Sequence, residues 1–124
     1  MHVPPFSPPP GKCFIALDFE TADQGRDSAC ALGMAKVFED TVVEQYYYLI
    51  RPPRKTFLFT GIHGITWNQV AGESSFAELW PTLQPILAEA DYLVAHNASF
   101  DRGVLHTCCR ELALVEPPPQ QFYC

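Results

Sequence analysis

The sequence predicts a mixed α/β fold in which helices pack against a central sheet. Three β-type segments separated by short turns lie between residues 14 and 50, and two segments with apolar residues at helical spacing follow at 76–90 and 99–112. A short apolar segment at 92–95 separates these two. An antiparallel meander followed by a β–α crossover is typical of a mixed sheet with flanking helices, so we expect a three-strand meander joined by a parallel strand.

The first predicted strand, residues 14–21, is an apolar run interrupted by Asp18 and Glu20. Residues two apart in a strand point to the same face, so the two carboxylates should lie roughly 7 Å apart on one side of the sheet. Two carboxylates in a core are costly unless something compensates their charge. Oxygen ligands suit Mg²⁺ or Mn²⁺ rather than zinc, which makes this strand a candidate metal site.

Two further strands complete the predicted meander. After a polar loop at 23–27, β-branched and aromatic residues predict strands at about 28–38 and 41–50, joined by a tight turn at 39–40. The proline pair at 52–53 ends the third strand.

Two capping boxes, at 66–69 and 75–78, predict helix starts after an irregular segment at 54–64. The second box begins a helix whose apolar residues recur at helical spacing: Phe76, Leu79, Trp80, Leu83, Leu87 and Ala90. Pro81 and Pro85 interrupt this helix, and we expect a kink or a tightened turn there.

The last predicted helix follows the short strand at 92–95 and runs over about 99–112, with prolines at 117–119 closing it off. Its apolar stripe comprises Phe100, Val104, Cys108 and Leu112. Asp101 lies in the first turn and off this stripe. An acidic residue there can simply favour the helix N-terminus, but a helix that follows a core strand directs its first turn across the end of the sheet. Asp101 is therefore a candidate partner of the first strand's carboxylates.

Composition limits the function classes. The chain has 124 residues, enough for one domain, and a net charge of −6. That charge argues against a basic surface that coats duplex nucleic acid, although bound divalent cations reverse the local charge of a carboxylate site.

Cysteines, termini and hydropathy suggest a cytoplasmic protein without a membrane span. Five scattered cysteines form no CxxC pair and indicate structural thiols in a reducing compartment. The sequence has no signal-peptide pattern and no apolar stretch of membrane-spanning length. Residues 1–11 contain five prolines and predict an extended, disordered leader, which leaves 12–124 as the domain.

Two acidic motifs in this order resemble those of the DEDD 3′–5′ exonucleases. Residues 14–21 (FIALDFET) resemble the first motif and residues 96–101 (HNASFD) the second. Between them, residues 62–66 (IHGIT) are similar to the His-Gly-Ile element of the epsilon-subunit branch, the proofreading subunits of DNA polymerase III. Residues 26–30 match stand-alone bacterial relatives of that branch. The resemblance covers about residues 13–124.

The resemblance implies a ribonuclease H-like sheet and a site with two Mg²⁺ or Mn²⁺ ions. Asp18 would bind both metals, Glu20 one of them and Asp101 the second, and these three residues would be the catalytic set. The implied reaction hydrolyses the terminal phosphodiester at the 3′ end of a single-stranded nucleic acid and releases nucleoside monophosphates. DNA is favoured as the substrate, and the choice between DNA and RNA stays open at this point. The resemblance also implies substrate contacts, from the backbone of Thr21 and from a weaker set: Ala22, His63, Asn97 and Phe100.

The third motif of this family is not found after Asp101. That motif contributes a fourth acidic ligand and a histidine or tyrosine that acts on the attacking water. We therefore expect residues 12–124 to be the N-terminal part of an exonuclease domain that is incomplete at its C-terminus. A missing helix layer would expose apolar sheet surface and favour homodimers.

Three alternatives to a plain fragment remain open at this point. The chain could be a non-catalytic module that binds nucleic acid or a polymerase. Another chain could complete the site. The acidic residues could also be capping groups of an ordinary α/β domain.

Overall fold

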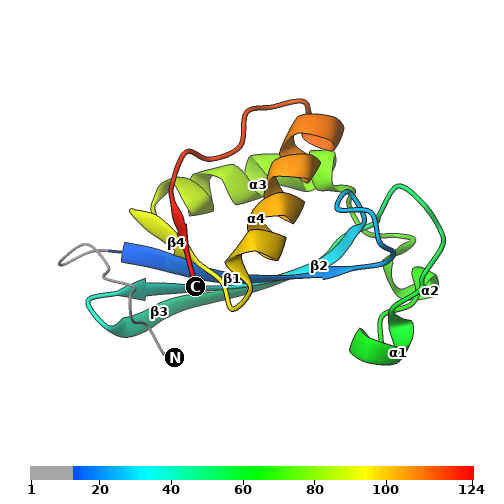
Figure 1. The fold of residues 1–124 in the computed structure, drawn as a ribbon, viewed down its shortest axis with the longest axis horizontal. Coiled ribbons are helices and arrows are strands. Elements are labelled where there is room, and N and C mark those ends of the chain that lie inside the picture. Colours follow the sequence, from blue (N-terminus) through cyan, green and yellow to red (C-terminus); the bar gives the residue numbers. More distant parts are fainter. Residues whose placement is uncertain (1–12) are drawn as a thin grey trace.

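A five-stranded sheet forms the frame of the protein, with the two longest helices on one face and two short helices at one end of the other (Figure 1). The computed structural model describes residues 13–124, so the predicted leader at 1–11 lies outside the described residues. The strand order is β3-β2-β1-β4-β5, and the strands span Cys13–Thr21 (β1), Ala29–Phe38 (β2), Thr41–Leu49 (β3), Tyr92–Val94 (β4) and Phe122–Tyr123 (β5). This arrangement confirms the predicted mixed α/β class.

The predicted meander is present with nearly the expected bounds. β1 pairs antiparallel with β2, and β2 pairs antiparallel with β3. The turn between β2 and β3 places Glu39 and Asp40 at φ 49° and 66°. Two left-handed residues at a hairpin turn match the right-handed twist of the strands, which explains how so short a connection joins them.

The parallel part of the sheet contains one strand more than the sequence predicted. β4 pairs parallel with β1, as expected, through partners such as Ile15 and Leu93. β5 then pairs parallel with β4. It escaped prediction because its two residues are too short a run to show the alternation on which a strand prediction depends.

Five helical segments follow the meander: α1 (Thr60–His63), α2 (Trp67–Val70), α3 (Phe76–Ala88), α4 (Ala98–Thr107) and the π-helix η1 (Cys108–Ala113). Both capping boxes are formed, at the start of α2 and of α3. The segment 54–64 is not wholly irregular, since it contains α1. No helix of residues 13–124 is long and apolar enough to cross a membrane.

Two details of the long helices differ from the prediction. Pro81 and Pro85 do not divide α3, which continues through both of them. Both are exposed, so the carbonyls that lose their helical donors can turn toward water. The predicted helix at 99–112 is real, but its last third is the π-helix η1.

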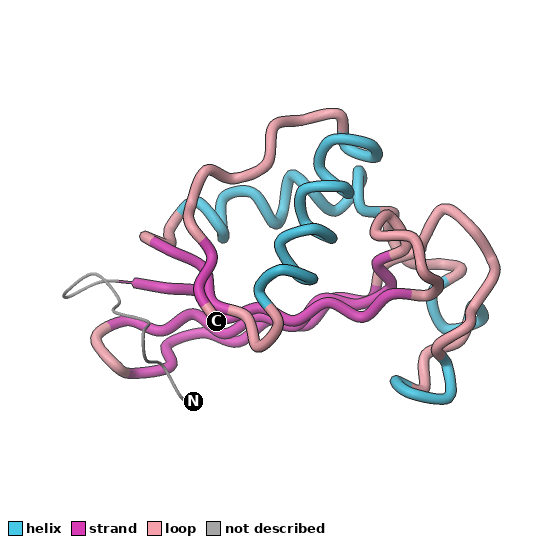
Figure 2. Tube along the Cα trace, in the orientation of Figure 1, coloured by secondary structure: helices cyan, strands magenta, loops and turns pink. Residues whose placement is uncertain are grey.

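The long helices α3 and α4 cover one face of the sheet, and α1 and α2 lie at one end of the opposite face (Figure 2). β1 buries its odd-numbered residues on the face of α3 and α4, whereas Asp18 on the opposite face is exposed and Glu20 is half-buried. The expectation that both carboxylates lie in the core is therefore wrong, because the long helices pack against the other face of this strand. On the same face as Asp18, Val42 is 51% exposed and Tyr47 is 64% exposed.

Candidate metal centre

The three predicted acidic residues meet where β1 extends beyond β4. β4 pairs with residues 14–16 of β1, and the first turn of α4 lies alongside the next part of the strand. Asp101 accepts a hydrogen bond on Oδ1 from the backbone N–H of Phe19, at 2.9 Å. Because Phe19 lies between Asp18 and Glu20, this bond places the Asp101 carboxylate beside both of them.

Asp101 is buried and lies in an unfavourable electrostatic environment. Its exposure is 2%. Burial raises the pKa of its carboxyl to about 6, and the charges of Asp18 and Glu20 act in the same direction, while the hydrogen bond from Phe19 opposes the change. None of the four ion pairs found in residues 13–124 involves these three carboxylates. The site therefore gathers negative charge without a protein cation.

This donor set fits a hard divalent cation. Carboxylate oxygens are the ligands that Mg²⁺ and Mn²⁺ prefer, and a cation would offset the repulsion that raises the pKa of Asp101. The geometry is open rather than closed, since no three His, Cys, Asp or Glu residues within 13–124 lie close enough together to enclose an ion. The structure thus brings the three predicted ligands to one place without forming a complete cage.

His63, a predicted substrate contact, braces the end of β1. Its Nδ1 accepts from the N–H of Ile65 at 3.0 Å, which assigns the ring proton to Nε2. Nε2 then donates to the carbonyl oxygen of Thr21 at 3.0 Å and lies 4.0 Å from Sγ of Cys30. His63 is therefore positioned to hold the strand end that follows the acidic pair, and its contact with substrate stays a prediction.

The other predicted substrate residues differ in what they present to solvent. Thr21 and Ala22 are buried, and the N–H and carbonyl of Ala22 bond to Ser28 and Leu58. Asn97 is exposed just before α4, with no capping bond from its side chain. Phe100 is half-buried in the first turn. Asn97 and Phe100 therefore leave more surface available beside Asp101 than the two residues at the end of β1.

Arg26 is a neighbour of the site for which no role was predicted. Its Nη1 donates to the carbonyl of Ser99 at 3.2 Å, and its guanidinium lies 5.8 Å from the centre of the Phe100 ring. A Cβ at position 103 would overlap this guanidinium, so Gly103 provides the space for it. The thiol of Cys108 donates to the Arg26 carbonyl. These contacts fasten the β1–β2 loop to the helix that carries Asp101, and the sequence offered no signal for them beyond the family match at 26–30.

A second acidic cluster lies a few residues beyond the first and has the opposite character. Arg54 donates through Nε to Asp23 at 2.9 Å and through Nη1 to Asp27 at 2.9 Å. The Arg54 guanidinium holds the pKa of both carboxyls below the ordinary value. Asp23 also accepts from the N–H of Gly25 at 2.7 Å. This cluster closes the β1–β2 loop, and its charge is already compensated.

The mixed five-stranded sheet with its flanking helices has the ribonuclease H-like fold. The sequence profile of the RNase_T exonuclease family matches residues 15–124. The chain therefore belongs to this exonuclease family and to a lineage of metal-dependent phosphodiester hydrolases.

Curated relatives and solved structures agree with this assignment. The chain is 35% identical over 91 residues to a PolC-type DNA polymerase III of Thermotoga petrophila, which covers 71% of this chain and 7% of the relative. It is 28% identical over 96 residues to a PolC-type DNA polymerase III of Streptococcus agalactiae, covering 75% of this chain and 6% of the relative. The chain thus spans less than a tenth of the curated relatives it matches.

Two solved exonucleases share the fold. A structure of exonuclease X in complex with 5′ overhanging duplex DNA matches with a TM-score of 0.68 at 24% identity, over 90% of this chain and 58% of that one. A product-bound structure of exonuclease I matches with a TM-score of 0.78 at 13% identity, over 90% of this chain and 29% of that one.

Proposed function

We propose that this domain acts at the 3′ end of single-stranded nucleic acid, DNA rather than RNA, and releases nucleoside monophosphates. The observation that carries the proposal is the meeting of Asp18, Glu20 and Asp101 at the end of one strand, in a chain of the exonuclease family. The polymerase context of the PolC relatives supports a role beside a polymerase.

The residues of the site would have two roles: the carboxylates would bind the ions, and neighbouring residues would contact the end of the substrate. Asp18 and Glu20 would present carboxylates from the face of the sheet opposite the long helices, and Asp101 would supply the third from α4. Two bound Mg²⁺ or Mn²⁺ ions would stabilise the charge that develops on the attacking and leaving oxygens. Asn97 and Phe100 would border the terminal nucleotide on the α4 side. The exposed strand end at Asp18 would admit it on the other.

Hydrolysis by these 124 residues alone should be slow. The family's third motif supplies a fourth acidic ligand and a residue that acts on the attacking water, and the acidic residues after Asp101 are Glu111 and Glu116. Neither stands with a histidine or tyrosine in the arrangement of that motif. A missing general base typically lowers a rate by a factor of about 10² to 10⁴.

A strand labelled at its 5′ end and incubated with Mn²⁺ tests the proposal. We expect slow shortening from the 3′ end with release of mononucleotides, lost in Asp18→Asn and kept in Asp23→Asn, whose carboxylate belongs to the compensated cluster. Shortening from the 5′ end, or cleavage that persists in Asp18→Asn, would contradict the proposal.

A second candidate is a non-catalytic module that binds nucleic-acid ends or a polymerase, and the open arrangement of the acidic residues within 13–124, which encloses no ion, favours it. Binding of a 3′ end that is unchanged by removal of Mn²⁺ and by Asp18→Asn, together with no release of mononucleotides, would support this candidate over the enzyme.

A further inference from the structure

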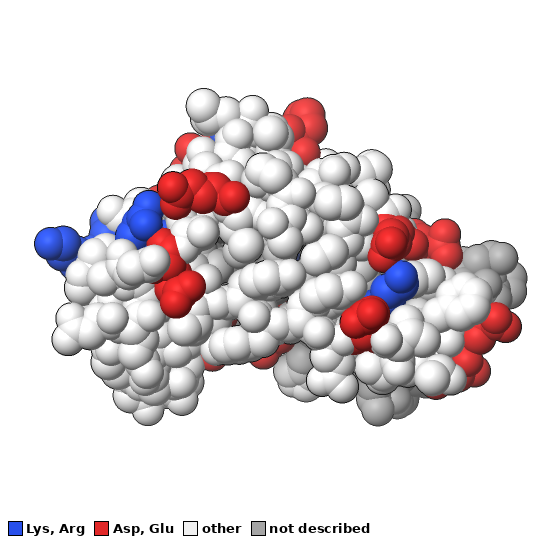
Figure 3. All heavy atoms as spheres, turned by 180° about the vertical axis from the view of Figure 1, so that it is seen from behind, with Lys and Arg blue, Asp and Glu red and all other residues white. Residues whose placement is uncertain are grey.

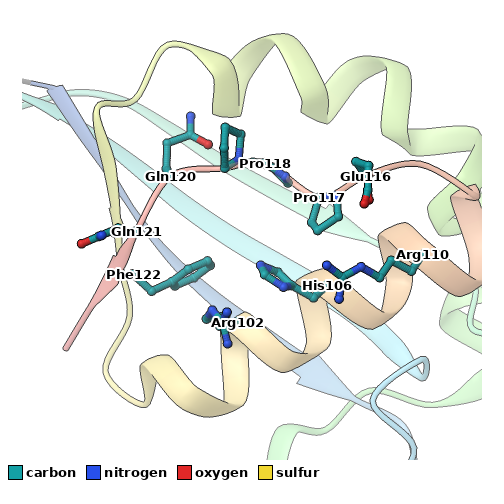
Figure 4. Close-up of a pocket in the computed structure, with 10 residues that line it drawn as sticks. Arg102, His106, Arg110, Glu116, Pro117, Pro118, Gln120, Gln121 and Phe122 are labelled. Carbon is teal, nitrogen blue, oxygen red and sulfur yellow. The ribbon is translucent and has the colours of Figure 1, made fainter.

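A groove of about 410 Å³ runs between α4 and the segment 116–122, apart from the acidic site (Figure 4). Arg102 and His106 project into it from α4 and Arg110 from η1, which continues that helix, and Glu116 and Phe122 border the groove from the opposite side. Its volume lies within the range of pockets that bind small ligands. The feature that separates it from the rest of the surface is its set of cations.

Arg102 and Arg110 lack a carboxylate partner, unlike most other cations in the described part of the chain. Lys36, Arg51 and Arg54 all form ion pairs, whereas no ion pair within residues 13–124 includes either arginine of the groove. The reverse side of the molecule shows the usual pattern, with charged side chains in small groups separated by uncharged surface (Figure 3). The α4 groove thus concentrates uncompensated positive charge on a chain of net charge −6.

The positive charges of the two arginines act on the pKa of His106, which lies between them. Burial and the charges of Arg102 and Arg110 lower the pKa of His106, and Glu116 acts in the opposite direction. Glu116 is also the one carboxylate among the residues that line the groove. With two arginines against one glutamate, the groove favours an anion.

The shape and remaining walls of the groove suit a ligand that has a ring as well as an anionic group. The ring of Phe122 meets the imidazole of His106 edge to face, with centres 6.5 Å apart, and proline rings form the adjacent wall. The Gln120 amide is turned away and donates to the carbonyls of Leu87 and Ala90. Polar contacts to a ligand would therefore come mainly from the α4 cations.

We propose that the α4 groove binds the phosphate of a nucleotide unit, with its base against the Phe122 wall. Arg110 follows Arg102 by eight helical positions, about 12 Å along the axis. The two guanidiniums can therefore contact opposite ends of one nucleotide, or two phosphates of one strand. Arginine is well suited to phosphate because its planar fork can bind two oxygens. The choice of a nucleotide among phosphate ligands rests on the proposed function, whereas the anion site itself does not.

Binding measured in EDTA tests this assignment without any contribution from the metal centre. Fluorescence anisotropy with labelled (dT)₁₂ and calorimetry with dAMP would compare the wild type with the double variant Arg102→Gln/Arg110→Gln. The double variant Arg51→Gln/Lys55→Gln is the matched control, because it removes the same formal charge from half-buried and exposed positions outside the groove.

We expect the groove variant to weaken at least one of the two ligands by tenfold or more, and the control to change neither by more than about twofold. Weaker binding of (dT)₁₂ alone would identify a nucleic-acid strand as the ligand. The slope of log K against log salt concentration should then become shallower by about 0.7 for each phosphate contact that the variant loses. Loss with dAMP would identify a free nucleotide.

Equal binding of both ligands by the wild type and the groove variant would overturn the proposal. Selective binding of an acidic peptide such as (Glu)₈ in place of both nucleotides would also overturn it. Either result would leave the Mn²⁺-dependent assay of Asp18 unaffected, so the two proposals fail separately.

Discussion

Two acidic clusters lie at β1, one formed by Asp18 and Glu20 of the strand with Asp101 of α4 and the other in the loop that follows the strand, and they differ in how their charge is compensated. In the loop, the guanidinium of Arg54 bonds to both Asp23 and Asp27 and lowers the pKa of their carboxyls. At the metal centre, Asp101 is buried beside two further carboxylates and its pKa rises to about 6. Residues of the same chemical type therefore stabilise the fold in one place and strain it in the other.

The difference separates a cluster that serves the structure from one that we propose serves the chemistry. A compensated cluster needs nothing from solution. An uncompensated cluster with a buried member costs folding free energy unless a cation arrives, and natural proteins keep such sites where function requires them. Substitutions in the two clusters should accordingly change the free energy of unfolding in opposite directions and by different amounts.

The largest expected contrast is in the binding of Mn²⁺. Asp18→Asn removes one of three carboxylates and should weaken Mn²⁺ at least tenfold in a calorimetric titration. Asp23→Asn should leave the affinity unchanged, because Asp23 is engaged by Arg54. Equal affinities in the two variants would remove the distinction between the clusters.

The next contrast is in stability without metal. In EDTA at pH 7.5, Asp101→Asn should raise the free energy of unfolding by about 2 kcal/mol, because it removes a buried charge and keeps an oxygen for the Phe19 N–H. Urea unfolding measures this change. A destabilised Asp101→Asn would show that the carboxylate is a structural hydrogen-bonding group.

In the loop cluster, the corresponding substitution should destabilise the fold instead of stabilising it. Arg54→Gln should lower the free energy of unfolding by about 1 kcal/mol, because it leaves Asp23 and Asp27 facing each other without a cation in a partly exposed setting. Urea unfolding at pH 7.5 measures the loss, and Lys55→Gln is the control for removing a nearby positive charge.

The two clusters should also depend on pH in different windows. The pKa of Asp101 is raised to about 6, so the folded state binds its proton first, and stability should increase as pH falls from about 7 to about 4. Asp23 and Asp27 have lowered pKa values, so their contribution is full above pH 4–5 and is lost as pH falls below about 4. The first change should vanish in Asp101→Asn and the second should shrink in Arg54→Gln, both followed by urea unfolding in EDTA.

The smallest effect is expected at α4, the helix that carries Asp101. Gly103→Ala adds a methyl group where the Arg26 guanidinium lies, but alanine favours a helix over glycine by about 1 kcal/mol. We expect a net change in unfolding free energy below about 1 kcal/mol together with weaker Mn²⁺ binding, since Arg26 braces the first turn of α4. Unchanged Mn²⁺ binding would show that the Arg26 contacts do not contribute to the candidate metal centre.

Much of the fold followed from local pattern. The alternation in β1 to β3, the two capping boxes and the helical stripe of α4 are each encoded by near neighbours in the sequence. β5 and the π-turn of η1 were missed because a two-residue strand and a change in helix type depend on tertiary packing. Likewise, the sequence showed that Asp18 and Glu20 share a face but not that this face is the one opposite the long helices.

The candidate residues came from the sequence, whereas their surroundings came from the structure. Spacing and the family motifs pointed to Asp18, Glu20 and Asp101, and the structure places Asp101 against the backbone between the other two. Their role as metal ligands stays a prediction. The bracing by His63 and Arg26 depends on contacts across 42 and 73 residues of chain. No local pattern carries such contacts, so only the three-dimensional arrangement could reveal them.

The most direct test of the account compares the effect of Mn²⁺ on the unfolding free energy of the wild type and of Asp101→Asn at pH 7.5. In EDTA the variant should be the more stable protein. Saturating Mn²⁺, at about 100 times its Kd, should stabilise the wild type by about 2.7 kcal/mol and the variant by much less, which would close or reverse the difference. Equal stabilisation of both proteins, or of neither, would contradict the claim that Asp101 completes a divalent-cation site with the β1 carboxylates.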